Sequence, residues 1–233
     1  MLDDNHPIFE ACKTGDIAVV ESYLKDGGSV YAESEHNPPI FGIAANREHK
    51  DLLELMLQYG LDINMRHNRF GGSLAEFAIH KDSVEWLDYF IQKGIPIDVR
   101  DNHGFTLLLL AAAGGKTKCL TYLLERGASL EARNESSGKT PFMHAASSNQ
   151  IQALEILLHA GSHIEDRDYN NATSLINAAK GGKVEAVQWL LDHGADINAK
   201  DERGKTASDW ATTNGHTEIV KLLNKRHGNC GIG

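Results

Sequence analysis

Apolar residues recur at helical spacing in two short stripes within residues 168–200. The first stripe is small and consists of Leu175, Ala178 and Ala179. The second stripe is bulkier and consists of Val184, Val187, Leu190 and Leu191. Gly181 and Gly182 lie between the stripes, where they favour a turn. The pattern predicts two antiparallel helices, an alanine-lined one that approaches its neighbour closely and a larger one that fills the core.

The same pattern recurs along the chain at a spacing of 33 or 34 residues. It is marked by a glycine after each second stripe: Gly27, Gly60, Gly94, Gly127, Gly161 and Gly194. We therefore expect seven units, at residues 1–33, 34–67, 68–100, 101–134, 135–167, 168–200 and 201–228. One-residue insertions are expected near His67 and within residues 134–137, in loops that absorb them without disturbing the helices.

Several units share a fuller signature. Unit seven opens with Asp201, Gly204 and Thr206, and unit six ends in the sequence Gly-Ala-Asp-Ile-Asn-Ala from Gly194. This arrangement resembles the ankyrin repeat. The resemblance implies an all-α solenoid of seven helix-turn-helix units with extended finger loops, forming a single domain over residues 1–228 and leaving a flexible tail at 229–233.

Units two and three depart from the template. Unit two has residues 37–40 where glycine, threonine and proline are expected, and Gly42 lies inside the following helix, at a cost of about 1 kcal/mol relative to alanine. We expect units one to three to be the least stable part of the array. Unit one has no finger before it, and unit seven ends in polar residues, so both are interpreted as caps.

Composition narrows the class of protein. The formal net charge of −9 argues against nucleic acid as the main ligand. Three scattered cysteines, Cys12, Cys119 and Cys230, indicate a reducing compartment, and Cys12 stands at a small core position. The apolar run 105–113 is too short to span a membrane, and no secretory signal is visible, so we expect a cytoplasmic protein that does not bind membranes.

No motif for catalysis is present. The sequence has no phosphate loop, dinucleotide fingerprint or nucleophile elbow. His159 and His163 are four residues apart but are separated by a helix end, so we interpret them as solvated rather than metal-binding. His49 and His216 match a family position at which histidine caps the second helix. We expect neither enzyme activity nor a cofactor nor a metal site.

The resemblance implies that partners are proteins, held by the fingers and the inner faces of the first helices. The last residue of each unit is mostly cationic: Glu33, Arg66, Arg100, Arg133, Arg167 and Lys200. The neighbouring candidates are Arg69, Phe70, His103, Phe105, Lys139, Tyr169 and Lys180. Arg203 and Lys205 occupy similar positions in unit seven. Acidic residues concentrate instead on the second helices, so a basic inner face with an acidic back is predicted.

Alternatives remain for these residues. Three of the cations can pair with the aspartate that opens the next unit: Arg100 with Asp101, Arg167 with Asp168 and Lys200 with Asp201. Phe70 and Phe105 can pack on each other. Trp210 is assigned to packing within the last cap, and Trp86, Trp189 and Tyr122 to packing between units.

The leading hypothesis is a monomeric, non-enzymatic protein that binds an acidic or mixed-charge protein surface in its groove. It would act as an inhibitor, an antitoxin-like immunity protein or an adaptor. The alternative is a bacterial effector that binds a protein of a foreign cell.

Overall fold

The computed structural model describes residues 1–65 and 72–229, which contain fourteen helices. The odd-numbered helices have seven residues or, in α1, eight: α1 Pro7–Thr14, α3 Ile40–Asn46, α5 Ala75–Lys81, α7 Leu107–Ala113, α9 Pro141–Ser147, α11 Ser174–Lys180 and α13 Ala207–Thr213. The even-numbered helices are longer: α2 Ile17–Lys25, α4 Lys50–Gln58, α6 Val84–Gln92, α8 Thr117–Glu125, α10 Ile151–His159, α12 Val184–Asp192 and α14 Thr217–Asn229. The helix pairs predicted from the stripes are confirmed.

Each first helix from α7 onward begins at a buried or half-buried threonine. The Thr173 hydroxyl accepts a hydrogen bond from the amide of Ile176, and Thr106, Thr140 and Thr206 act in the same way. A side-chain acceptor at this position satisfies an amide that the helix itself leaves without a partner. In α3 the corresponding residue is Pro39, which makes no such bond. Unit two therefore lacks a stabilising contact that four of the later units have.

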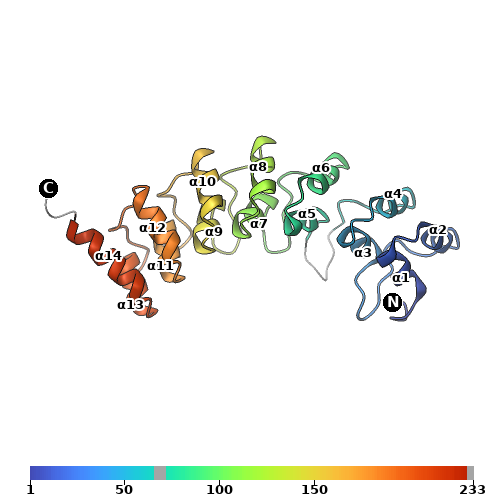
Figure 1. Ribbon diagram of the computed structural model, residues 1–233, viewed down its shortest axis with the longest axis horizontal. Helices are drawn as coiled ribbons and strands as arrows, with labels where there is room; N and C mark the ends of the chain where they lie inside the picture. The colour runs from blue at the N-terminus through green and yellow to red at the C-terminus, as the bar shows by residue number, and fades with distance from the viewer. Residues whose placement is uncertain (66–71, 230–233) are drawn as a thin grey trace. The chain divides into compact units, whose positions relative to one another are not determined.

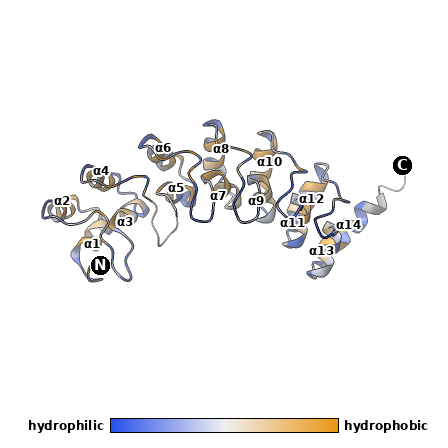
Figure 2. Ribbon diagram, turned by 180° about the vertical axis from the view of Figure 1, so that it is seen from behind, coloured by the Kyte–Doolittle hydropathy of each residue, from blue (hydrophilic) through white to orange (hydrophobic). Residues whose placement is uncertain are grey.

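The two stripes of residues 168–200 are buried to different extents. Leu175, Ala178 and Ala179 are buried, as are Val187 and Leu190. Val184 and Leu191 are only half-buried. In Figure 2 the hydrophobic colour follows the packed helices and the loops are hydrophilic. The core is therefore a thin layer between helices, and part of the second-helix stripe remains at the surface.

The six glycines that mark the repeat all have positive φ angles, from 84° at Gly127 to 105° at Gly94. Each ends a second helix in the left-handed conformation, which other L-residues adopt only with strain. This explains why the spacing of glycine located the units so well.

The chain divides into two compact parts, which we write with numerals as unit 1 and unit 2. The seven sequence repeats keep their numbers in words, unit one to unit seven. Unit 1 comprises residues 1–77 and 89–95, and unit 2 comprises residues 78–88 and 96–233, so the boundary passes through α5 and α6. In unit 1, α1 packs against α2 and α3, and α4 packs against α2 and α3. The single domain and the numbered repeats proposed from the sequence remain a prediction.

Unit 2 is a double row of helices. The first helices α7, α9, α11 and α13 pack side by side, and so do the second helices α8, α10, α12 and α14. Figure 1 shows the first helices on the inner side of the bend within this unit and the second helices on the outer side. We call these two sides the inner face and the outer face of unit 2.

The first residues of unit 1 take the place of a finger. The Leu2 amide donates to the carbonyl of Glu33 at 2.9 Å, and the Asp4 carboxylate lies 2.6 Å from Nδ1 of His36. Hydrogen bonds from Ser34 and His36 lower the pKa of Asp4 to about 2. The prediction that unit one lacks a finger therefore misses a short loop that packs against the next finger.

The last helix, α14, continues to Asn229, beyond the point at which the sequence suggested a tail. Arg226 forms an ion pair with Asp192 on α12, and the basic residues of its last turns suit the negative end of a helix. These contacts explain why the polar sequence remains helical. Residues 230–233 lie outside the described part of the chain.

Candidate protein-binding surface

Three fingers of unit 2 are organised by an aspartate that opens the repeat. Oδ1 of Asp168 accepts hydrogen bonds from the amides of Asn170 at 2.9 Å and Ala172 at 3.0 Å. Asp101 and Asp201 make the same pair of bonds, to the amides two and four residues later. The carboxylate thus folds its own loop, as aspartate commonly does in turns.

One finger contains the predicted insertion. There Asn134 replaces the aspartate, and its Oδ1 accepts bonds from the Ser137 hydroxyl at 2.7 Å and from the amide of Lys139 at 3.1 Å. The bond to the backbone now spans five residues instead of four. The extra residue is accommodated inside the loop, and α9 still begins at Pro141.

The arginines at the bases of the fingers form a ladder of hydrogen bonds to backbone carbonyls. Nη1 of Arg100 donates to the carbonyl of Gly104 at 2.7 Å and to that of Arg133 at 2.9 Å. Arg133 donates to Gly138 and Arg167, and Arg167 to Asn171 and Lys200, all at 2.7–2.8 Å. Each guanidinium therefore joins its own finger to the next one.

This arginine ladder differs from the aspartate pairing considered as the alternative. The aspartates bind loop amides, whereas the guanidinium groups bind carbonyls. The two bonds use the two hydrogens of Nη1, and the Nε–Nη2 edge of a guanidinium has three further donors. Arg133 and Arg100 are half-buried, whereas Arg167 and Lys200 are exposed. The other cations of this series and their neighbours, Arg66, Arg69 and Phe70, lie outside the described residues.

The aromatic residues of the fingers occupy different surroundings. Phe105 is half-buried and its ring centroid lies 4.9 Å from that of His144 on α9. The proposed contact between Phe105 and Phe70 cannot be placed, since Phe70 is outside the described residues. Tyr169 is 62% exposed, the most exposed aromatic side chain among the described residues. Its ring rests over Gly138, where an added Cβ would lie only 2.3 Å from Cδ1 of the ring.

A cluster around Trp210 was missed by the sequence analysis, which assigned this residue to packing within the cap. Lys180 Nζ and Lys205 Nζ lie 4.3 Å and 4.4 Å from the ring centroid, and the Arg203 guanidinium lies at 5.9 Å. The indole Nε1 donates to Oδ2 of Asp201 at 2.7 Å. Trp210 lies four residues after its threonine cap, as His144 and Asn177 do in the preceding repeats. That shared repeat position is the signal that could have placed Trp210 on the inner face.

Burial and neighbouring charges shift several pKa values on this face. Burial lowers the pKa of Lys139, and nearby Lys180 lowers it further while Asp168 opposes the shift. Burial, with help from Lys139, lowers the pKa of His144 to about 4. Lys139 Nζ lies 3.2 Å from the Ser147 hydroxyl, so this lysine is partly held within the finger. His144 is therefore neutral near pH 7.

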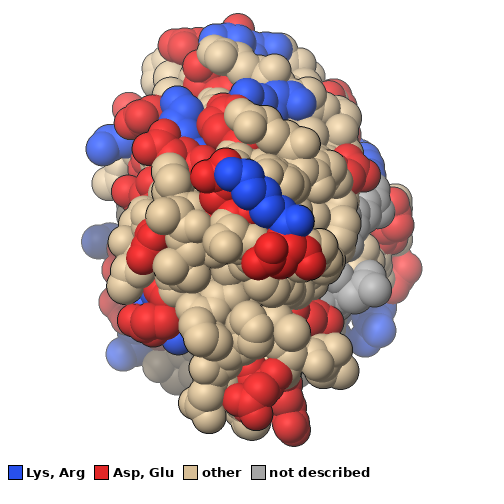
Figure 3. All heavy atoms as spheres, turned by 90° about the vertical axis from the view of Figure 1, so that its right-hand side faces the viewer, with Lys and Arg blue, Asp and Glu red and all other residues tan. Residues whose placement is uncertain are grey.

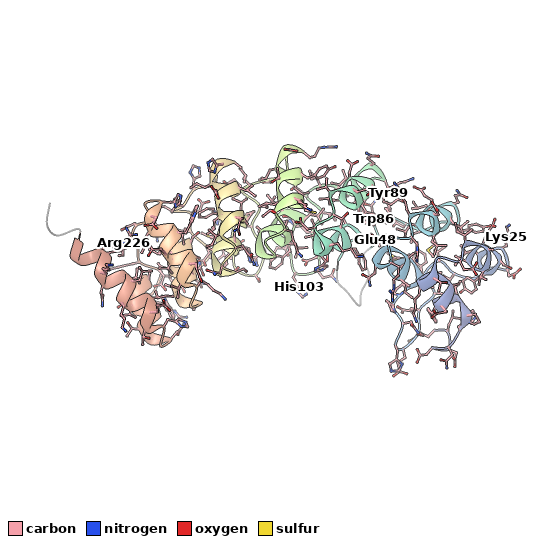
Figure 4. All side chains as sticks on the ribbon, in the orientation of Figure 1. Lys25, Glu48, Trp86, Tyr89, His103 and Arg226 are labelled. Carbon is pink, nitrogen blue, oxygen red and sulfur yellow. The ribbon has the colours of Figure 1, made fainter. Side chains whose placement is uncertain are left out.

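The remaining candidates lie on the surface. His103 is exposed at the tip of its finger (Figure 4), where its amide donates to Asp101. Lys180 is exposed at the end of α11, over the Trp210 ring. In unit 2 the inner face thus brings together Lys139, Tyr169, Lys180 and the Trp210 cluster.

The outer face of unit 2 has shallow grooves between second helices. One, of about 460 Å³, lies between α10, α12 and α14, and another, of about 450 Å³, is lined from α6, α8 and α10. These grooves lie between second helices, away from the fingers. On the end of unit 1 that carries α2, Figure 3 shows acidic and basic side chains interspersed.

Two histidine assignments need correction. His49 makes no side-chain bond to its own helix. Instead its Nε2 lies 3.1 Å from the carbonyl of Lys13, and Nε2 of His216 lies 3.2 Å from that of Lys180. These rings therefore connect consecutive repeats, because the turn glycines Gly15 and Gly182 leave space for them.

Chemistry-bearing groups do not converge elsewhere in the described residues. Residues 1–65 and 72–229 contain no group of three or more His, Cys, Asp or Glu side chains placed to hold a metal ion. Cys12 and Cys119 are buried free thiols whose pKa values burial raises to about 12. Within the same part of the chain, no helix combines the length and apolar character needed to cross a membrane.

Comparison with known families agrees with the geometry. A family model described as ankyrin repeats in three copies matches residues 74–168 and 162–232, and a second, described as ankyrin repeats in many copies, matches residues 43–91. The chain belongs to the ankyrin-repeat family. Ankyrin repeats are general protein–protein interaction modules, and the family is typically non-enzymatic.

One curated relative is the ankyrin repeat protein nuc-2 of Neurospora crassa. It is 27% identical over 120 residues, which cover 52% of this ankyrin-repeat chain but only 11% of the relative. The chain thus spans about a tenth of that protein's length, and the similarity concerns the repeats.

Proposed function

We propose that this ankyrin-repeat chain binds a partner protein on the inner face of unit 2 and acts without catalysis, as an inhibitor, immunity protein or adaptor. The observation that carries the proposal is the exposed ring of Tyr169. It lies over Gly138, beside a face that also presents Lys180 and the Trp210 cluster. Tyrosine, tryptophan and arginine are the residues that most often contribute strongly to protein binding.

The charges of this face favour a partner with an acidic or mixed-charge surface. Lys180, Lys200 and Arg203 are exposed on it, although the whole chain has a net charge of −9. Side chains already held by the scaffold lose little conformational entropy on binding. Binding should weaken as salt concentration rises, because exposed charges are screened.

The arginine ladder determines which substitutions can test the proposal. Replacing Arg100, Arg133 and Arg167 would remove their carbonyl bonds, so a loss of binding could reflect damage to the fingers. Tyr169→Ala, Lys180→Glu and Lys200→Glu change side chains that project from the surface and keep the backbone contacts. Glu155→Lys, on the outer face, is the matched control.

The experiment is affinity capture from lysate of the source cells at low and high salt, followed by mass spectrometry and direct binding measurements with the purified protein found. We expect the partner to bind the unmodified chain and Glu155→Lys, and to be lost from the triple inner-face variant. Equal binding by the triple variant, with its helical circular dichroism intact, would refute the proposal.

A further inference from the structure

The groove on the outer face between α10, α12 and α14 has a composition that the proposed function does not use. Its apolar lining consists of Ile151, Val184, Trp189 and Leu222, all half-buried. Its charged lining residues are all acidic: Glu185, Asp192 and Glu218. The groove lined from α6, α8 and α10 differs, because Lys118 lies there together with Glu125. An apolar centre with a rim of one charge is typical of a contact surface.

One lining residue of this groove, Trp189, packs against two other rings. The Trp189 ring is stacked on His193, with centroids 3.7 Å apart, and its other neighbour, Phe142, lies 6.2 Å away. Nδ1 of His193 in turn lies 2.7 Å from the carbonyl oxygen of Trp189. Val184 and Leu191 belong to the stripe predicted to fill the core, yet they remain half-buried. The fold therefore leaves apolar surface of α12 exposed in a defined shape.

Hydrogen bonds position two of the carboxylates at the rim, those of Glu185 and Asp192, and favour their charged forms. Hydrogen bonds from its own backbone and from Asn149 lower the pKa of Glu185. A bond from Gln188 and the nearby Arg226 guanidinium lower the pKa of Asp192, although slight burial opposes the shift. Arg226 projects from α14 toward α12, where it pairs with Asp192 (Figure 4). This internal pair shows that the rim accommodates a guanidinium.

We infer that this groove binds a basic amphipathic helix of a partner protein. Glu185 and Asp192 are seven residues apart on one helix, which corresponds to about 10.5 Å along its axis. A helix lying beside α12 matches this spacing when it carries arginine at positions i and i+7. Leucines at i+3 and i+4 then face Val184, Trp189 and Leu222. The inference does not depend on the inner face. The cations there favour an acidic partner, whereas this groove favours a basic one.

The test uses a fluorescein-labelled, alanine-based helical peptide of about 18 residues, with arginine at i and i+7 and leucine at i+3 and i+4. One control peptide has glutamate in place of arginine, and another has the same composition with the arginines moved to the opposite face. Binding to the full chain is measured by fluorescence anisotropy. We expect the designed peptide to bind at least about ten-fold more tightly than either control, and less tightly as salt rises.

Variants locate the site. Glu185→Lys combined with Glu218→Lys should weaken binding about ten-fold, because both residues are exposed and their reversal repels the arginines. Arg226→Ala should strengthen peptide binding about two- to three-fold, because it removes the cation that pairs with Asp192. Glu155→Lys, on α10 and outside the lining of this groove, and Lys180→Glu on the inner face should leave it unchanged. Equal binding of the three peptides, or no effect of the double reversal in a folded protein, would overturn the inference.

Discussion

Oδ1 of Asn149 accepts a hydrogen bond from the amide of Ala186 at 2.9 Å, so a turn residue of one repeat caps the second helix of the next. The Asn149 amide nitrogen also donates to Glu185 at 2.8 Å. Asp82 makes the equivalent bond to the amide of Cys119. Both residues have positive φ angles, 61° and 53°, at a turn where four other repeats have glycine and one has Glu48. The backbone strain is thus accompanied by a contact between repeats that glycine cannot make.

Substitutions at Asn149 should separate the two effects. Asn149→Ala loses the cap and keeps the left-handed backbone, so we expect the free energy of unfolding to fall by about 2 kcal/mol. Asn149→Gly loses only the cap and should cost about 1 kcal/mol less than alanine. Asn149→Asp keeps the acceptor but replaces the donor to Glu185 with a second carboxylate, so it should also be less stable than the unmodified protein. Urea denaturation measures all three, and equal losses for alanine and glycine would contradict this account.

The arginine ladder should contribute to stability independently of any partner. We expect Arg133→Ala to lower the free energy of unfolding by about 2 kcal/mol, because two charged hydrogen bonds to carbonyls are lost. Arg133→Lys should recover less than half, since the lysine ammonium lies one bond short of the position that Nη1 occupies. Lys200→Ala is the control, because its side chain is exposed at the same repeat position. A change within about 0.5 kcal/mol is expected there; a loss as large as that of Arg133→Ala would argue against the ladder.

His144 should make stability depend on pH. Its pKa is lowered from 6.5 to about 4 in the folded protein, so protons bind the unfolded chain more readily. Stability relative to a His144→Asn variant should be constant above about pH 7 and fall as pH decreases from 6.5 to about 4, by at most about 3 kcal/mol. Asparagine is the matched residue, because Asn177 occupies the equivalent position. Parallel pH profiles for the two proteins would show that His144 is not buried as described.

Two glycines of unit 1 provide a matched pair. A Cβ added at Gly42 would meet only Cζ of Phe77, at 3.9 Å, so Gly42→Ala should raise the free energy of unfolding by about 1 kcal/mol. A Cβ added at Gly28 would lie 2.4 Å from the Tyr23 ring, so Gly28→Ala should destabilise. Thermal denaturation of both variants measures the difference. A decrease in stability for Gly42→Ala would show that the helix needs this glycine.

Units one to three are predicted to be the least stable part of the array, because units two and three depart from the repeat template. Amide hydrogen exchange of the full chain should show lower protection over residues 7–65 than over α7–α12. Equal protection in the two parts would reject it.

The sequence was sufficient to predict the helices, because their stripes and the glycines between them express local geometry. It was also sufficient for the looped insertion after Arg133. The direction of the arginines could not be predicted, since their acceptors are carbonyls of a finger 33 or 34 residues away. Only the folded loops bring Arg100 close to the carbonyl of Arg133.

Trp210 shows a different limit. Its type suggested packing in a cap, whereas its repeat position, shared with His144 and Asn177, places it on the inner face. Its contacts with Lys180 and Lys205 depend on the conformations of long side chains, which the pattern of apolar positions does not specify. The half-buried Val184 was likewise invisible as part of a groove, because its spacing is that of a core residue.

The arginine ladder gives the row of fingers a direction. The guanidinium groups of Arg100, Arg133 and Arg167 each donate toward the C-terminus, to a carbonyl of the next repeat, and none of these three described steps runs the other way. Shortening the array from its C-terminal end would leave a cation with one acceptor missing. Shortening it from its N-terminal end would leave only a carbonyl, which water readily satisfies. The two ends of the array are therefore chemically unequal, and loss of structure should spread more easily from one than from the other.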